Sequence, residues 1–125
     1  MPKWKVAQIV VTPKISDEEK QRVIARLKEL KAEVIAGSSF KTRAVIYSDD
    51  RGSAASGGFY KINRKTQFVK EFKDVAFSLN EGEISEPFET EYGFHIIMVE
   101  KIKGQEVELR HILMMPKVSE QIGRA

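Results

Sequence analysis

The sequence predicts an α+β fold, in which helices cover a small β-sheet. The first observation is the run 93–101, where apolar side chains fall on both parities, as in a strand that is covered on both faces. The second is the helical spacing of apolar residues in the segments 23–34 and 68–79. The third is size, because 125 residues, 42% of them apolar, suit one compact domain with a core better than two domains.

The first element in chain order is a predicted strand over residues 5–12. This segment is rich in β-branched side chains, which favour strands. It stops at Pro13, which has no N–H to contribute to a β-ladder. Gln8 lies in the middle of the predicted strand.

A long helix is predicted next, beginning at Asp17. Ser16 and Glu19 have the spacing of a capping box, and the acidic residues of the first turn suit the positive end of the helix dipole. Gly37 follows at a position where glycine commonly ends a helix. The apolar stripe expected to face the core is Val23, Leu27, Leu30 and Val34.

The middle of the chain predicts a short second helix, a loop and a third helix. Ser38 or Ser39 is a suitable cap for the second helix. Residues 48–58 are nearly all turn formers, and residues 59–62 then form a brief extended piece. The third helix, of about three turns, is indicated by apolar residues at helical spacing: Phe68, Phe72, Val75, Ala76 and Leu79.

The last predicted elements are a turn with a short edge strand, residues 83–92, and the two-sided strand 93–101. His95 is the only polar side chain inside the apolar run of the strand 93–101. An imidazole in a strand covered on both faces needs a hydrogen-bond partner. We therefore expect another part of the chain to supply polar groups that face His95.

A short internal repeat sets the expected domain organisation. Residues 5–16 recur approximately as residues 108–119, with Ile, Pro, Lys and Ser in register at an offset of 103. The predicted organisation is one domain over 4–103, a linker over 104–107, and the truncated start of a second repeat over 108–125.

The composition argues against several classes of function. The net charge is only +3, and the 21 basic and 18 acidic residues are interleaved, which is typical of a solvated mixed-charge surface. No apolar run approaches the ~20 residues of a membrane span, and the first residues lack the apolar region of a signal peptide, so we expect no membrane insertion. With no cysteine, the chain has neither disulfides nor thiolate metal sites. A weak alternative, nucleic-acid binding, rests on Lys61, Arg64, Lys65, Lys70 and Lys73.

Several motifs occur together in the order and spacing of one family. They are Ser48-Asp49-Asp50-Arg51-Gly52-Ser53-Ala54, Gly57-Gly58, Phe68-x-x-x-Phe72, Ala76-Phe77-Ser78-Leu79, Gly82-Glu83-Ile84-Ser85-Glu86-Pro87-Phe88-Glu89-Thr90 and Gly93-Phe94-His95-Ile96-Ile97. The chain resembles the parvulin-type (PpiC, rotamase) peptidyl-prolyl cis-trans isomerases, and among them the tandem-domain periplasmic foldases and chaperones of the SurA kind. The resemblance spans roughly residues 4–103.

The resemblance implies a four-stranded antiparallel sheet surrounded by helices, and no cofactor. The family's site has two histidines on central strands, an Asp or Cys at the end of a Ser-x-Asp segment, a threonine, and an apolar pocket for the proline ring. His95 matches the second histidine, Asp50 the Asp or Cys, and Thr90 the threonine. The walls of the pocket are matched by Phe68, Phe72 and Tyr60.

The main departure from the family pattern is Gln8, which stands where the first histidine is expected. Glutamine donates and accepts hydrogen bonds but does not ionise, so it can hold His95 in place without forming a titrating pair. The expected catalytic set is His95, Asp50, Thr90 and Gln8. His111 is interpreted as the matching position in the second repeat, and a metal pair with His95 is not expected because neither has further ligands at metal-binding spacing.

Two functions are consistent with these residues. The first is a peptidyl-prolyl cis-trans isomerase that assists the folding of secreted or outer-membrane proteins, and the intact Asp50, Thr90 and His95 favour it. The alternative, favoured by Gln8, is a catalytically weak or silent peptide-binding chaperone module of the same fold. In both cases the resemblance implies proline-containing or unfolded polypeptides as clients, a second parvulin domain in the full-length chain, and the periplasm as location.

Overall fold

The computed structural model describes residues 15–118, and residues 1–14 and 119–125 lie outside this description. The predicted strand over 5–12, with Gln8, therefore falls outside the described residues, as does the end of the predicted second repeat. Within the described part, helices and strands follow in the order helix, helix, strand, helix and three strands, with one short 3-10 turn before the first strand. This confirms the predicted α+β class.

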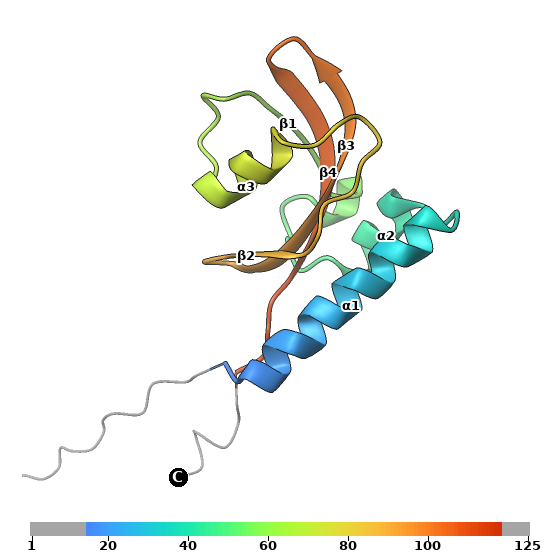
Figure 1. Ribbon diagram of the computed structural model, residues 1–125, viewed down its shortest axis with the longest axis vertical. Coiled ribbons are helices and arrows are strands. Elements are labelled where there is room, and N and C mark those ends of the chain that lie inside the picture. The colour runs from blue at the N-terminus through green and yellow to red at the C-terminus, as the bar shows by residue number, and fades with distance from the viewer. Residues whose placement is uncertain (1–14, 119–125) are drawn as a thin grey trace, which may run out of the picture.

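Four antiparallel strands form one sheet in the order β1-β4-β3-β2 (Figure 1). The strands are β1 (Phe59–Ile62), β2 (Phe88–Thr90), β3 (Gly93–Lys103) and β4 (Glu106–Met114). The two long strands, β3 and β4, lie in the centre and pair with each other, with a register shift between Val99 and Lys101. The four-stranded antiparallel sheet is thus confirmed.

Two helices cover one face of this sheet, and a third covers the other face (Figure 1). α1 (Asp17–Ile35) begins where predicted, because the Ser16 hydroxyl accepts a hydrogen bond from the Glu19 N–H at 3.1 Å. α2 (Phe40–Tyr47) begins in the same way, with Ser39 as its cap. Both starts follow from local side-chain chemistry, which explains why the sequence predicts them.

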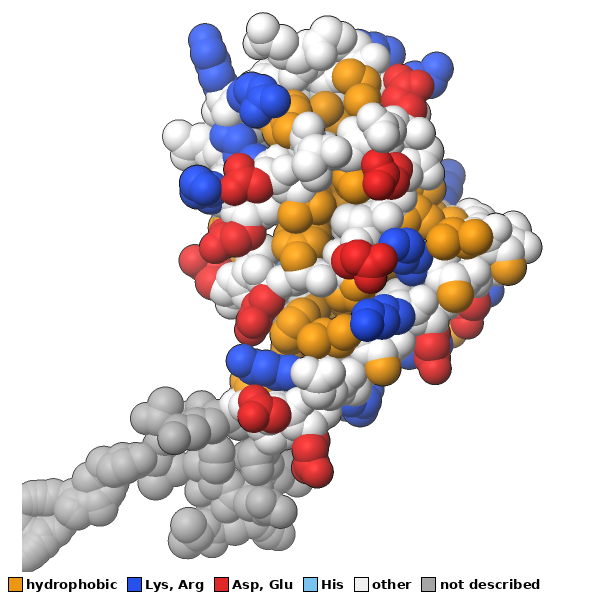
Figure 2. All heavy atoms as spheres, viewed as in Figure 1, with side chains coloured by type: hydrophobic (Ala, Val, Ile, Leu, Met, Phe, Trp, Pro, Cys, Tyr) orange, Lys and Arg blue, Asp and Glu red, His pale blue; other side chains and the backbone are white. Residues whose placement is uncertain are grey.

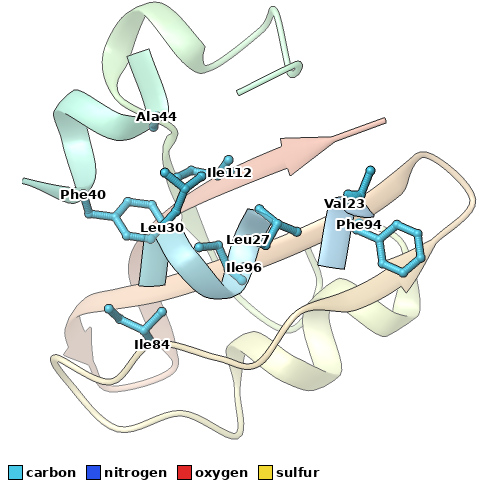
Figure 3. Packing of buried hydrophobic residues seen from close by; sticks show 9 residues of the cluster. All are labelled: Val23, Leu27, Leu30, Phe40, Ala44, Ile84, Phe94, Ile96 and Ile112. Carbon is cyan, nitrogen blue, oxygen red and sulfur yellow. The ribbon is translucent and has the colours of Figure 1, made fainter. Parts of the chain in front are cut away.

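The first hydrophobic core lies between α1, α2 and the sheet (Figure 3). Val23, Leu27 and Leu30, three members of the predicted stripe, are buried on the sheet side of α1. They pack with Phe94 and Ile96, which point from β3 toward the helices. A fully buried side chain of this size contributes about 1.5–3 kcal/mol, so this stripe fixes α1 on the sheet.

The opposite face of the sheet is covered by α3 (Lys70–Ala76), which is shorter than predicted. Val69, at the N-cap position, has extended backbone angles, and the Phe68 N–H donates to the Thr66 carbonyl in the preceding turn. Phe68 therefore lies outside the helix, and the prediction of three turns over 68–79 is wrong. The core under α3 consists of Ile62, Phe72, Ala76, Leu79, Ile97, Val99, Val107 and Leu109.

β4 corrects the predicted domain boundary. Residues 106–114 pair with β1 on one side and β3 on the other, and Leu109 and Ile112 are completely buried. Gly104 and Gln105 form the turn of the β3–β4 hairpin, with Gly104 at a φ of 61°, so residues 104–107 are not a linker. The prediction that the domain ends at residue 103 is wrong, because β4 belongs to the same sheet. The tight turn brings this strand, part of the repeated segment, back onto β3.

Charged side chains of both signs are mixed on the surface. On the face in Figure 2, basic and acidic side chains alternate around apolar patches. Two of the basic residues considered for nucleic-acid binding have partners within the protein. Lys70 forms an ion pair with Asp74 at 3.0 Å, and Lys73 donates a hydrogen bond to the Arg64 carbonyl. No helix among residues 15–118 is long and apolar enough to cross a membrane.

Candidate active site

Two histidines meet in the centre of the sheet, on the face that α3 covers. His95 belongs to β3 and His111 to β4, and their side chains are 4% and 3% exposed. Strand alternation places His95 on the same face as Ile97, and His111 on the same face as Leu109, both of which belong to the core under α3. The imidazole rings stack with 5.6 Å between centroids, and their Nδ1 atoms are 3.5 Å apart.

Hydrogen bonds hold the pair of rings at both ends. His95 Nε2 is 2.7 Å from Thr90 Oγ1, and His111 Nε2 is 2.8 Å from Asp50 Oδ2. The Thr90 hydroxyl accepts the Tyr92 N–H at 3.1 Å, which leaves its own proton for His95 Nε2. With both rings neutral, one direction of donation satisfies all three contacts. Thr90 donates to His95, His95 donates to His111, and His111 donates to Asp50.

Asp50 is positioned by the turn-rich loop 48–58. Its Oδ2 accepts hydrogen bonds from the hydroxyls of Ser53 at 2.7 Å and Tyr60 at 2.9 Å, and its Oδ1 accepts the Gly52 N–H at 3.1 Å. The loop backbone is also bonded to β4 through an N–H of the loop and a carbonyl of the strand. The run of turn formers therefore folds a carboxylate back onto the centre of the sheet.

Burial determines the charges of these groups. It lowers the pKa of His95 to about 4, an effect that nearby His111 reinforces and Asp50 partly opposes. It also lowers the pKa of His111, against the hydrogen bond to Asp50. Burial raises the pKa of Asp50, but its side-chain hydrogen bonds, led by that from Ser53, outweigh this and leave the pKa below its usual value. At neutral pH the site thus holds an ionised carboxylate beside neutral imidazoles.

Aromatic rings form an apolar wall next to the histidines. Phe72 of α3 stands edge-on to both imidazoles, with centroids 5.6 Å from His95 and 5.2 Å from His111. Phe68 packs edge-on against Phe72 at 5.2 Å, and Tyr60 packs against Phe68 at 4.9 Å. Phe72 is buried while Phe68 and Tyr60 are half-buried, so the wall rises from the core to the surface.

A cleft of about 960 Å³ opens over this wall and the imidazoles. This volume is typical of a site that takes an organic ligand or a short stretch of peptide. The floor of the cleft is apolar and aromatic, and charged side chains such as Arg51, Lys65 and Lys73 stand at its rim. Residues on the floor include Tyr60, Phe68, Phe72, His95, His111 and Leu113.

The structure brings the described members of the predicted site together. Asp50, His95 and the three aromatic residues of the wall all line the cleft. Thr90 is buried behind His95 and contacts it without being part of the lining. Gln8 lies outside the described residues.

Three residues of the site are not among those that the sequence predicts. His111 is missed because the repeat assigns it to a second copy, although the same repeat aligns it with Gln8 and so marks it as a site position. Ser53 lies 3.1 Å from His111 Nε2 and belongs to the loop motif, which is the signal for it. Phe88 stacks on His95 at 5.2 Å, and its signal is its place in the motif that ends at Thr90.

The arrangement suits binding of an apolar ring next to fixed dipoles. The aromatic wall offers van der Waals contact, and the buried polar chain from Thr90 to Asp50 presents hydrogen-bonding atoms in a fixed direction. Over residues 15–118, no three His, Asp or Glu side chains are grouped so as to hold a metal ion.

Comparisons with known proteins found a matching family model and several relatives. Residues 9–101 match the family model described as the PPIC-type PPIASE domain, or rotamase. The chain is 42% identical over 82 residues to Foldase protein PrsA 1 of Bacillus cereus, an overlap of 66% of this chain and 29% of that protein. It is 33% identical over 109 residues to Chaperone SurA of Chromohalobacter salexigens, covering 82% of this chain and 25% of the relative.

A second SurA shows the same partial overlap. The chain is 39% identical over 93 residues to Chaperone SurA of Alkalilimnicola ehrlichii, which is 74% of this chain and 21% of that protein. This chain therefore spans only between a fifth and a third of the length of these relatives.

Proposed function

Because this chain belongs to the PpiC-type (parvulin) peptidyl-prolyl isomerase family, we propose that it catalyses cis-trans isomerisation of Xaa-Pro bonds in unfolded polypeptides. The observation that supports this best is the open aromatic wall of Tyr60, Phe68 and Phe72 beside the paired imidazoles. A pyrrolidine ring packed on this wall has its peptide bond next to His95 and His111.

The physical task of such a site is to favour a twisted amide. Resonance across the planar peptide bond imposes a barrier of about 18–20 kcal/mol. Twisting removes part of the charge separation between oxygen and nitrogen, so surroundings that are less polar than water favour the twisted state. The half-enclosed apolar cleft provides such surroundings. No covalent bond is made or broken, so the reaction requires no nucleophile.

We assign the polar residues to orientation and electrostatics, not to proton transfer. Burial keeps His95 and His111 neutral at pH 7, with the pKa of His95 at about 4. His95, His111 and Asp50 line the cleft and are the candidate catalytic residues. Thr90 acts through His95 and is a positioning residue.

A second candidate is a peptide-binding module that holds extended chain without turnover. The wide aromatic rim favours it, because Tyr92 is 55% exposed and lines the same cleft as the half-buried Phe68 and Tyr60. An aromatic surface of this kind binds many peptides, whether or not they contain proline.

Exchange NMR on a short Xaa-Pro peptide separates the two functions. We expect the chain to accelerate cis-trans exchange, and Phe68→Ala to reduce both binding and exchange by about tenfold or more through loss of one wall of the pocket. Phe77→Ala is the matched control, since Phe77 packs against the same core under α3 and does not line the cleft.

The outcomes are distinct. Peptide binding without any acceleration leaves only the binding module. Equal effects of Phe68→Ala and Phe77→Ala contradict both functions, because the cleft is then not where the peptide binds.

We also propose that the clients are exported polypeptides, that the protein works in the periplasm, and that a second parvulin domain belongs to the full-length chain. The names of the relatives, a foldase and chaperones, support a role in folding. The small part of each relative that the chain spans supports a second domain.

A further inference from the structure

We propose that Arg110 is a positioning residue for the isomerase site, and that it holds the loop 48–58 against β4 from the face of the sheet opposite the cleft. Arg110 does not line the cleft, so it acts on the reaction through Asp50 and Ser53 and not by touching a peptide. The effect on catalysis rests on the proposed function, whereas the contacts that support the inference do not depend on it.

The guanidinium of Arg110 joins three parts of the chain. Its Nε donates to the Glu100 carboxylate of β3 at 2.7 Å. Its Nη1 donates to the carbonyls of Ser56 at 2.9 Å and Gly57 at 3.2 Å. The Arg110 side chain is only 16% exposed, so water screens these contacts little, and hydrogen bonds from a charged donor are stronger than those between neutral groups. Arg110 therefore ties the loop 48–58 to both central strands.

Two local features allow this contact. A Cβ at Gly57 would lie 2.6 Å from Arg110 Nη1, so any larger residue there displaces the guanidinium, and the φ of 75° also favours glycine. The register of β3 against β4 shifts between Val99 and Lys101, which leaves Glu100 as the extra residue of a β-bulge. Bulges re-aim side chains, and this one carries the carboxylate that holds Arg110.

Hydrogen bonds lead from the carbonyls that the guanidinium holds directly to the site. The Ser53 carbonyl accepts the N–H of Ser56 at 3.0 Å and that of Gly58 at 2.7 Å. The Ser53 hydroxyl donates to Asp50 Oδ2 at 2.7 Å and lies 3.1 Å from His111 Nε2. Movement of the held segment therefore shifts Ser53, and with it the carboxylate beside His111.

Arg110 and His111 are consecutive residues of β4, and strand alternation directs their side chains to opposite faces of the sheet. His111 faces α3 and contacts Asp50. Arg110 is paired with Met98, which packs against the core under α1 and α2 on the other face (Figure 1). The loop 48–58 is thus held from both faces of one strand, and loosening the Arg110 contact on one face changes the geometry of Asp50 on the other.

A second ion pair across the same two strands provides a matched control. Lys103 of β3 pairs with the Glu108 carboxylate of β4 at 3.1 Å. In the described part of the chain, this pair makes no hydrogen bond to the loop 48–58. Lys103→Met therefore removes a cross-strand ion pair without disturbing the loop, whereas Arg110→Met removes both the ion pair and the loop contact.

NMR titration of His111 tests the positioning role separately from activity. Asp50 raises the pKa of His111 against the effect of burial, so Asp50→Asn lowers it by an amount that depends on how closely the carboxylate is held. We expect this shift to shrink by about half or more in the Arg110→Met background and to stay unchanged in the Lys103→Met background. Comparing the shift within each background cancels the direct effect of removing the arginine charge.

Exchange NMR over a range of Xaa-Pro peptide concentrations tests the effect on the reaction. We expect Arg110→Met to lower kcat about tenfold and to change KM less than about twofold, because misplaced site groups affect the twisted amide more than they affect binding to the aromatic wall. We expect Lys103→Met to leave both constants unchanged.

Glu100→Gln is the milder variant, and it keeps the proposal testable if Arg110→Met fails to fold. It leaves the arginine and its carbonyl partners in place but removes the charge that orients the guanidinium. We expect it to move the titration and kcat in the same directions as Arg110→Met, by smaller amounts.

Three results would overturn the proposal: equal Asp50→Asn shifts with and without Arg110, equal effects of Arg110→Met and Lys103→Met, or an unchanged kcat in Arg110→Met when the unmodified chain catalyses exchange. Absence of exchange in the unmodified chain contradicts the proposed function instead, and the titration of His111 still decides whether Arg110 positions Asp50.

Discussion

At the scale of single residues, the site depends on one carboxylate. Asp50 accepts hydrogen bonds from two hydroxyls and one imidazole, and these bonds keep its pKa below the usual value despite burial. In return, Asp50 opposes the lowering of the His111 pKa by burial. The charge on Asp50 therefore controls how far the pKa of His111 falls below that of an ordinary histidine.

Removing this charge has a predictable effect on His111. In Asp50→Asn we expect the pKa of His111 to fall further, because the imidazolium loses its anionic partner while burial is unchanged. NMR titration of the imidazole signals measures this, and the chain has only two histidines to assign. Asp49→Asn is the control, because the Asp49 carboxylate bonds the Met115 N–H instead of an imidazole. An unchanged His111 titration in Asp50→Asn would contradict the described contact.

At the scale of elements, the loop that carries Asp50 and strand β4 are joined through Gly58. Gly58 has a φ of 77° and lies against the backbone of His111. Its close approach lets the loop place Asp50 on His111, so the loop and the strand form one unit. The contact between Asp50 and His111 thus depends on the packing of the loop against β4.

Two glycine substitutions test this joint. Gly82 has a similar φ of 82°, but a Cβ there would meet nothing within 4 Å. We expect Gly82→Ala to cost about 1–2 kcal/mol from backbone strain alone. Gly58→Ala adds the clash with the His111 carbonyl and destabilises the fold further. Urea unfolding of both variants measures the difference, and equal losses would show that the close approach does not matter.

At the scale of the whole molecule, the buried histidines make stability depend on pH. The pKa of His95 is about 4 in the folded chain, against 6.5 for an unperturbed histidine. Between these values the unfolded chain binds a proton that the folded chain does not, so stability is lost as the pH falls from 6.5 to 4. A shift of this size corresponds to roughly 3 kcal/mol. The lowered pKa of Asp50 acts in the same direction at more acidic pH.

Urea unfolding at a series of pH values checks this expectation. We expect the free energy of unfolding to decrease steadily from pH 7 to pH 4. His95→Gln is the comparison, because a side chain that does not titrate flattens this part of the curve. Identical pH profiles for the two proteins would exclude His95 as the cause.

Much of the fold is predictable because its signals are local. The caps at Ser16 and Ser39 mark where α1 and α2 begin, and the structure confirms both. The start of α3 is not predictable in this way, because Phe68 packs on Phe72 from a turn as well as it would from a helix. Spacing records that two side chains share a face, but not whether the backbone between them is helical.

The sequence by itself determined that His95 lies in a covered strand and that Asp50, Thr90 and the aromatic wall gather around it, because these residues carry recognisable local and family patterns. Only the tertiary structure decided that β4, and with it His111, occupies the centre of the sheet. Residues 5–12 and β4 have the same pattern of apolar positions, so no local signal separates them. The position of β4 rests on non-local terms, namely the hairpin turn at Gly104 and the pairing of β4 with both neighbouring strands.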